Sequence, residues 1–204
     1  MYLTLKRIFD LTFSFLVILL GLPLLVAIAV GIKISSPGPI FYKSLRIGKN
    51  FKHIYCWKFR TMYVDAEKRL IQLLETNSLL QEEWKKYQKL KNDPRIHPFG
   101  KILRKTSLDE LPQFLNVLRG ELSIVGPRPF CSMQVKSYLH DKAEKFLSVP
   151  PGITGIWQVS GRNLLTFEER LALEENYIDS RSFLLDLKII LKTIPAVLFE
   201  KGAY

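Results

Sequence analysis

Cysteine is scarce in this chain, and internal repeats and low-complexity tracts are absent from it. The 204 residues contain two cysteines, Cys56 and Cys131, which lie far apart in the spacing of neither a metal site nor a redox motif. This scarcity excludes a disulfide framework and a cysteine-based metal centre, and it predicts a reduced, cytosolic domain. The length is sufficient for one compact domain beyond any membrane segment.

Acidic side chains are also in short supply relative to basic ones. The chain has 19 acidic and 30 basic residues, which gives a formal net charge of +11. Such an excess suits nucleic acid, an anionic membrane surface or a phosphorylated substrate. The apolar segment described next favours the last two, so we expect membrane lipids as partners and no nucleic acid. Cations near anionic headgroups gain about 1 kcal/mol each, so part of the excess holds the domain to the membrane.

Charged side chains are missing altogether from residues 11–32, and this apolar run is long enough to cross a bilayer. Basic residues flank it on both sides, and cationic flanks normally mark the cytoplasmic side of a membrane. Pro23, near the middle of the run, removes a helical hydrogen bond and breaks or kinks the helix. We therefore expect a re-entrant hairpin over residues 1–36 that turns near Pro23 and returns to the face it entered.

Two alternatives to the hairpin stay open at this stage. A straight single-span anchor is one, because proline is tolerated in membrane helices. A secretory signal peptide is the other, because residues 27–29 read Ala-Ile-Ala, like a cleavage site. The run is longer than the usual signal core, and strongly basic sequence follows it.

The rest of the chain shows turn, strand and helix patterns. Residues 35–39 are a dense turn signal, and residues 40–42 and 53–59 are rich in aromatic and β-branched residues, with Gly-Lys-Asn at 48–50 between them. This predicts a β-hairpin, with strand content ending near Met62. Further helices are expected over residues 64–91, 107–118, 138–147, 166–177 and 184–199.

Three of these helices carry more specific expectations. In the first, the candidate core contacts are Leu70, Leu73, Leu74 and Trp84. Thr166 should cap the fourth helix, with acids in its first turn. The last helix is mostly apolar and contains Pro195, which suits a helix on the bilayer as well as one packed in a core.

The sharpest candidates for chemistry are the adjacent acids Asp109 and Glu110, at a helix start fixed by Pro112. Local structure alone could explain them, because Ser107 followed by Glu110 is a capping box. The same geometry allows a functional role. A helix N-terminus favours the ionised carboxylate, so Asp109 could act as a nucleophile and Glu110 could bind Mg²⁺.

Several cations lie in or beside turn-rich segments of the same chain. Arg128 is held between Pro127 and Pro129, so its backbone has little freedom to lose when it grips a phosphate. Each cation alone is explained as a solvated surface charge, whereas six of them beside an acid pair indicate a diphosphate site. The others are Lys58, Arg60, Arg104, Lys105 and Arg162.

Four ordered motifs carry a resemblance to a known family. They are KFRTM at residues 58–62, the segment 104–113 with SLDELPQ, GPRP at 126–129 and PGITGIWQVSGR at 151–162. Together they resemble the bacterial sugar transferases known as monotopic phosphoglycosyl transferases. The resemblance implies transfer of a sugar-1-phosphate from a UDP-sugar to polyprenyl (undecaprenyl) phosphate, the first membrane step in making exopolysaccharide, capsule, O-antigen or lipopolysaccharide.

The resemblance also implies roles for particular residues. Asp109 would be the nucleophile that carries the phosphosugar, UMP would leave, and Glu110 together with Asp109 would hold Mg²⁺. The implied substrate-binding residues are Lys58, Arg60, Arg104, Arg128, Gln158, Arg162 and Asn163. The form of the last motif favours a hexose donor.

The expected architecture is a mostly helical α/β protein on the cytoplasmic face of the bacterial inner membrane, with a monotopic hairpin. Residues 37–204 would form a cytosolic catalytic domain with a small sheet and interfacial helices, and a homodimer is an open possibility. Some family members have serine before the hairpin proline, where this chain has Leu22. Two rival functions remain, a glycosyl transferase that releases UDP and a noncatalytic scaffold that binds lipid headgroups.

Overall fold

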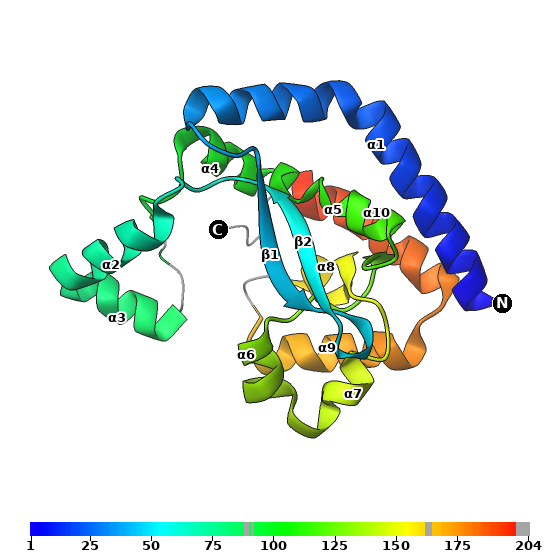
Figure 1. The fold of residues 1–204 in the computed structure, drawn as a ribbon. Coiled ribbons are helices and arrows are strands. Elements are labelled where there is room, and N and C mark those ends of the chain that lie inside the picture. The colour runs from blue at the N-terminus through cyan, green and yellow to red at the C-terminus, as the bar shows by residue number, and fades with distance from the viewer. Residues whose placement is uncertain (88–89, 91, 162–164, 199–204) are drawn as a thin grey trace.

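The computed structural model describes residues 1–87, 90, 92–161 and 165–198, which are arranged as in Figure 1. These residues are mostly helical and form two small two-stranded sheets. The long helix α1 (Tyr2–Ser35) lies along the outside of the folded remainder. The expected mostly helical class with small sheets is confirmed, whereas the division into domains at residue 36 stays a prediction.

Helix α1 has 34 residues and contains Pro23. Among the described residues it is the one helix long and apolar enough to cross a bilayer. Figure 1 shows it bent near its middle into two arms, and a proline inside a helix is a common cause of such a bend. The segment is thus a bent helix and not a closed hairpin, and its re-entrant topology stays a prediction.

The N-terminal arm of α1 carries polar side chains that face the folded domain. Lys6 Nζ donates to the Asp186 carboxylate at 2.8 Å and to the Val125 carbonyl at 2.9 Å. Asp10 Oδ2 accepts a hydrogen bond from Ser123 Oγ at 2.7 Å. All of these side chains are buried, so this arm is fixed in place by satisfied polar contacts.

The C-terminal arm of α1 is held by apolar packing instead. Ile28 and Ile32 are buried in a cluster with Phe59 and Leu103, and Phe99 packs against it. Ile32 has no exposed surface. Both arms of α1 therefore contact the same folded domain.

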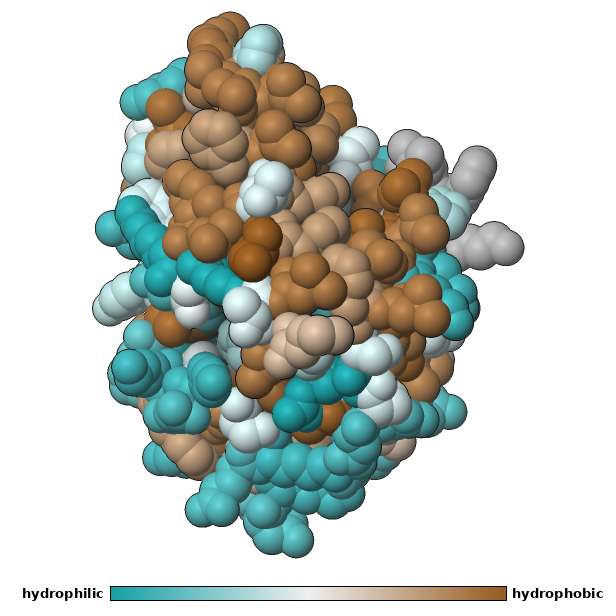
Figure 2. Space-filling model, turned by 90° about the vertical axis from the view of Figure 1, so that its right-hand side faces the viewer, coloured by the Kyte–Doolittle hydropathy of each residue, from teal (hydrophilic) through white to brown (hydrophobic). Residues whose placement is uncertain are grey.

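The outward side of α1 is apolar along both arms. Figure 2 shows hydrophobic side chains gathered over the upper part of the face turned to the viewer, with hydrophilic side chains below them. Exposed members on α1 include Leu16, Leu20, Val26 and Val30. A contiguous exposed apolar surface of this kind marks a membrane or a partner.

The predicted β-hairpin is confirmed. Strand β1 (Phe41–Ile47) pairs antiparallel with β2 (His53–Phe59), and the 3₁₀ turn η1 (Lys49–Phe51) lies between them. Ser44 lies opposite Cys56, so even-numbered residues of both strands share one face.

The expectation that strands end near Met62 is wrong. Strand β3 (Ser123–Val125) pairs in parallel with β4 (Gly152–Thr154) and forms a second sheet. Each of these strands has three residues beside a Gly-Pro or Pro-Pro turn, which is too short for a periodic pattern to show.

The charged segment after the hairpin forms two helices in place of one. Helix α2 (Ala66–Thr76) ends at Asn77, and α3 (Ser78–Tyr87) follows it as an arm that projects from the domain (Figure 1). None of the expected core contacts in this segment is fully buried, so their assignment to the core is wrong. They lie within the arm, at Leu70, Leu73, Leu74 and Trp84.

The remaining helices are α4 (Pro98–Lys105), α5 (Gln113–Leu118), α6 (Ser132–Gln134), α7 (Ala143–Phe146), α8 (Ile156–Ser160), α9 (Phe167–Ser180) and α10 (Phe183–Leu198). Of these, α5, α7, α8, α9 and α10 contribute to the main core around β3, whereas α4 packs in the cluster of Ile32. The core includes Val125, Phe146, Tyr177 and Ile189. The expected helix over 138–147 is only partly confirmed, because short π and 3₁₀ turns, η3 (Val135–Leu139) and η4 (His140–Lys142), precede α7.

The expectations for the last two helices hold. Thr166 Oγ1 accepts from the Glu169 backbone N–H at 3.2 Å, and Glu169 Oε2 accepts from the Thr166 N–H at 2.7 Å, so α9 begins with the predicted cap. Helix α10 buries Ile189 and exposes Leu191 and Ile194. It therefore serves the core on one side and offers apolar surface on the other.

Gly100 on α4 is a sensitive test of this packing, because a Cβ there would lie 2.1 Å from the Thr61 carbonyl oxygen. We expect Gly100→Ala to lower the free energy of unfolding by about 2 kcal/mol or more. The control is Gly21→Ala, where a Cβ meets nothing within 4 Å and helix propensity favours alanine by about 1 kcal/mol. Thermal unfolding in detergent compares the two, and equal midpoints would contradict the packing described.

Candidate active site

The acids Asp109 and Glu110 lie on η2 (Leu108–Glu110), a single 3₁₀ turn between α4 and α5. The capping-box explanation of this pair is wrong. Ser107 has a left-handed backbone with φ 56° and makes no side-chain cap bond. Helix capping therefore accounts for neither acid, and a strained backbone conformation stands directly before them.

Glu110 points at cations from two other segments. Its Oε1 lies 2.5 Å from Lys58 Nζ on β2 and 3.5 Å from Arg128 Nη2 in the GPRP loop. Burial alone would raise the pKa of this carboxyl, but Lys58 and Arg128 outweigh burial and lower the pKa to about 2. Glu110 is thus a fixed negative charge at any physiological pH.

Asp109 has a different environment from its neighbour. It is 9% exposed, and burial together with the Glu110 charge raises its pKa to about 6, although Lys58 and Arg104 act in the opposite direction. Two adjacent carboxyl groups therefore have pKa values that differ widely. Such a separation is typical of sites where one carboxylate has a chemical role and the other an electrostatic one.

Arg128 is held from its backbone by an acid that the sequence pattern did not reveal. The Arg128 backbone N–H donates to Glu174 Oε1 on α9 at 2.7 Å. Glu174 is buried, and burial raises its pKa to about 7. It stands within a run of helical acids, so no local signal distinguishes it from the solvated ones.

Trp157 supports the same loop. The Arg128 guanidinium lies 5.8 Å and the Arg170 guanidinium 4.7 Å from the centre of its ring. Arg128 keeps 43% of its side chain exposed, so it can meet a ligand from this supported position.

The structure separates two of the cations that were expected to act together. Arg104 is exposed, its Nε donates to Thr61 Oγ1 at 2.8 Å, and its charge acts on Asp109. Arg60 is buried and donates to the carbonyls of Ser36 and Pro37 at 2.5 and 2.8 Å. Arg60 therefore ties down the chain that leaves α1, and the structure does not bring it to the acids.

The last of the expected substrate-binding residues, Gln158, Arg162 and Asn163, follow β4 in the chain. Gln158 on α8 donates from Nε2 to the Ile153 carbonyl at 3.0 Å. Arg162 and Asn163 lie outside the described residues, so their roles stay predictions. The structure thus brings together Asp109, Glu110, Lys58, Arg104 and Arg128.

Comparison with known proteins identifies the family of this chain. The chain matches the family model described as "Bacterial sugar transferase" over residues 1–200. This chain belongs to the bacterial sugar transferase family. The resemblance found in the sequence motifs is confirmed, and the protein is an enzyme of the transferase class.

Curated relatives of this transferase cover nearly all of its length. It is 43% identical to the exopolysaccharide production protein ExoY of Sinorhizobium fredii, over 98% of this chain and 88% of the relative. It is 40% identical to the undecaprenyl-phosphate galactose phosphotransferase of Salmonella typhimurium, over 98% of this chain and 42% of that protein. Identity to the UDP-glucose:undecaprenyl-phosphate glucose-1-phosphate transferase of Escherichia coli is 38%, over 98% of this chain and 41% of that protein.

A pocket in the transferase opens beside Glu110. It lies between the β1–β2 hairpin and the GPRP loop, and cations from both segments reach it. Sequence patterns missed Arg46 and Gln113 here, although the alternation of β1 and β2 puts Arg46 on the same face as Lys58. The lining residues are Arg46, Cys56, Lys58, Glu110, Gln113, Arg128, Pro129, Gly152 and Ile153.

The described residues contain no group of three or more His, Cys, Asp or Glu side chains that could hold a metal. Mg²⁺ is usually held by one or two carboxylates together with substrate phosphates and water. Asp109 and Glu110 could supply the carboxylates of such a site, and Mg²⁺ binding by this pair stays a prediction.

The Lys58–Glu110 pair predicts a measurable change in acidity. Lys58→Met removes the cation that most strongly lowers the pKa of Glu110, so we expect that pKa to rise from about 2. A ¹³C NMR titration of labelled glutamate carboxyl groups measures it, with Glu110→Gln assigning the signal.

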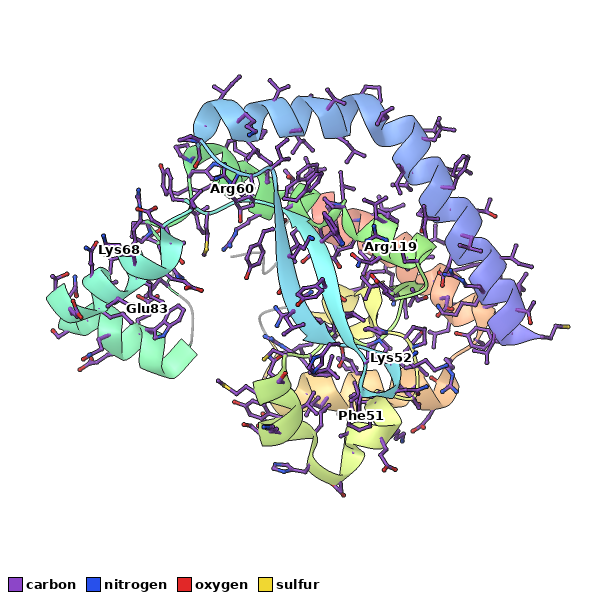
Figure 3. The ribbon with its side chains drawn as sticks, viewed as in Figure 1. Phe51, Lys52, Arg60, Lys68, Glu83 and Arg119 are labelled. Carbon is purple, nitrogen blue, oxygen red and sulfur yellow. The ribbon has the colours of Figure 1, made fainter. Side chains whose placement is uncertain are left out.

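Lys52→Met is the matched control. Lys52 is exposed at the hairpin turn, the opposite end of the hairpin from Arg60 in Figure 3. It should leave the Glu110 signal unchanged. An unshifted Glu110 in Lys58→Met would show that the 2.5 Å pair does not form in solution.

Proposed function

We propose that this transferase moves a sugar-1-phosphate from a UDP-sugar, a hexose donor by preference, to undecaprenyl phosphate and releases UMP. The carrying observation is the buried Asp109, which has a raised pKa and lies beside the Glu110–Lys58–Arg128 cluster. Two relatives support the substrate class, since their names specify undecaprenyl phosphate and hexose phosphate transfer. The ExoY relative supports a role in exopolysaccharide production.

The reaction takes place in two displacements at one phosphorus. A carboxylate oxygen of Asp109 attacks the sugar-side phosphorus of the donor, the bond to the bridging oxygen breaks, and UMP leaves with the electron pair. An oxygen of the lipid phosphate then attacks the same phosphorus, and Asp109 leaves as a carboxylate. One nucleophile can serve both substrates because the phosphosugar stays on the protein between the steps.

Each neighbouring residue has a distinct role in this scheme. Lys58 and Arg128 stabilise negative charge on the transferring phosphoryl group, and Arg104, whose charge also acts on Asp109, adds to this stabilisation. Glu110 holds the side chains of Lys58 and Arg128 in position. Mg²⁺ held by Asp109 and Glu110 with the donor phosphates would neutralise further phosphoryl charge.

The proposed setting is the cytoplasmic face of the inner membrane. Both arms of α1 contact one folded domain, through Lys6 at one end and Ile32 at the other. A straight span would put these two ends on opposite sides of a bilayer, which contact of both ends with one domain disfavours. This supports a monotopic, re-entrant segment over a straight span, and the basic flanks support the cytoplasmic side.

Nucleotide release with a panel of UDP-sugars, Mg²⁺ and undecaprenyl phosphate tests the reaction. We expect UMP and a lipid-linked sugar phosphate from one hexose donor. UDP as the nucleotide product would indicate direct glycosyl transfer, and no release from any donor would favour the noncatalytic scaffold.

Asp109→Asn tests the nucleophile in the same assay. The amide cannot form the acyl phosphate, so we expect turnover to fall by at least about 10³-fold while membrane binding stays intact. The matched control is Asp141→Asn, an exposed acid on η4, which should keep full turnover. Unchanged turnover in Asp109→Asn would remove this residue from the nucleophile role.

The rate of UMP release without lipid acceptor should depend on pH through Asp109. Its pKa of about 6 means that the reactive carboxylate rises from about one tenth at pH 5 to about nine tenths at pH 7. We expect the single-turnover rate to rise about tenfold over that interval and then level off. Glu110 stays ionised throughout, so a flat profile would contradict the assignment.

Cysteine labelling tests the topology. In a Cys56→Ser, Cys131→Ser background, single cysteines are introduced at Leu3 and at Ile34. Both positions are exposed, and they lie at the two ends of α1. An impermeant maleimide added to sealed vesicles should label both positions from the same side. Labelling from opposite sides would establish a straight span.

A further inference from the structure

Arg46 reaches the active-site pocket from a strand that carried no expected site residue. It lies on β1, where alternation places it on the same face as Ser44, and through the pairing on the face of Cys56 and Lys58. It is half-buried and lines the pocket together with Glu110 and Arg128. The sequence suggested only a juxtamembrane charge at this position.

The Cys56 thiol shows how closely the pocket charges are gathered. Cys56 is 2% exposed, and burial raises its pKa to about 11. The charges that act on it most strongly are those of Arg46, Lys58, Glu110 and Arg128. All four therefore surround one buried side chain.

The charges in this pocket do not balance. Three cations face one carboxylate, and Glu110 already pairs with Lys58 and contacts Arg128. None of the ion pairs within the described ranges includes Arg46. The two surplus positive charges would balance a dianion, and an arginine side chain can donate two hydrogen bonds to the oxygens of one phosphate group.

We propose that Arg46, with Lys58 and Arg128, forms a subsite for a phosphate monoester dianion in the pocket beside Glu110. In the proposed reaction Arg46 binds a phosphate group whose phosphorus is not attacked, whereas Asp109 carries the phosphosugar. Two phosphate monoesters could fill the subsite, UMP and the undecaprenyl phosphate acceptor. Naming these sources rests on the proposed function, whereas the phosphate chemistry rests on the pocket alone.

Binding measurements on the full chain in detergent test this subsite without requiring turnover. The probes are UMP and undecaprenyl phosphate, each titrated by isothermal calorimetry. A hydrogen bond to a charged group contributes about 1.5–3 kcal/mol, so Arg46→Gln should raise the dissociation constant of at least one probe by about 10- to 100-fold. Arg46→Lys keeps the charge and loses the fork, and it should give an intermediate loss.

Lys43→Gln is the matched control. Lys43 lies on the same strand but on the other face, 4.5 Å from the centre of the Trp57 ring. Its loss removes the same charge without touching the pocket, so both dissociation constants should stay within about twofold of the original. A thermal midpoint equal to that of the unmodified protein shows that Arg46→Gln is folded.

The outcomes distinguish the two sources and the two proposals. Weaker UMP binding alone assigns the subsite to the nucleotide, and weaker undecaprenyl phosphate binding alone assigns it to the acceptor. If folded Arg46→Gln binds both probes as the unmodified protein does, the subsite proposal fails. If the donor panel yields no UMP while Arg46→Gln still loses phosphate binding, the proposed function fails and the subsite stands.

Discussion

Lys6, near the N-terminus of α1, donates hydrogen bonds to Asp186 and to the Val125 carbonyl. A buried ammonium group is costly unless it is paired and hydrogen-bonded, so this contact fixes the rotation and the position of the N-terminal arm together. At the other arm, Ile32 is held by apolar packing that tolerates small shifts. The bend of α1 follows from these two attachments, since each arm must meet a different part of one domain.

The exit of α1 is linked to the active site through His97. Its Nδ1 accepts from the Gly100 N–H and lies 2.9 Å from Ser35 Oγ, so the ring proton is on Nε2, which donates to the Arg60 carbonyl. Arg60 in turn holds the carbonyls that follow α1, and Lys58 precedes it by two residues on β2. In the proposed membrane setting, the depth of α1 sets the height of the Lys58–Glu110 pair above the membrane, as the proposed reaction with a lipid phosphate requires.

Sequence patterns predicted the features that depend on local chemistry. The β-hairpin and the Thr166 cap each follow from residues adjacent in the chain. Arg60 was misplaced because an arginine after a strand looks the same whether it meets substrate or backbone carbonyls. Glu174 was missed because its partner Arg128 comes from the GPRP loop, and Arg46 was missed because its pocket is formed by segments that are distant in the chain. Strands β3 and β4 were missed because neither has a pattern of its own.

The distance along the chain between Lys6 and Asp186, 180 residues, imposes an order on biosynthesis. At translation rates of about 5–20 residues per second, the carboxylate emerges about 10–40 s after the helix that needs it. An unpaired lysine at hydrocarbon depth costs several kcal/mol. In the proposed membrane setting, the nascent N-terminal arm would therefore stay in the headgroup layer, where its charges are hydrated, until the last helix folds back. Membrane insertion would then be the closing step of folding, and a truncated chain lacking α10 could not complete it.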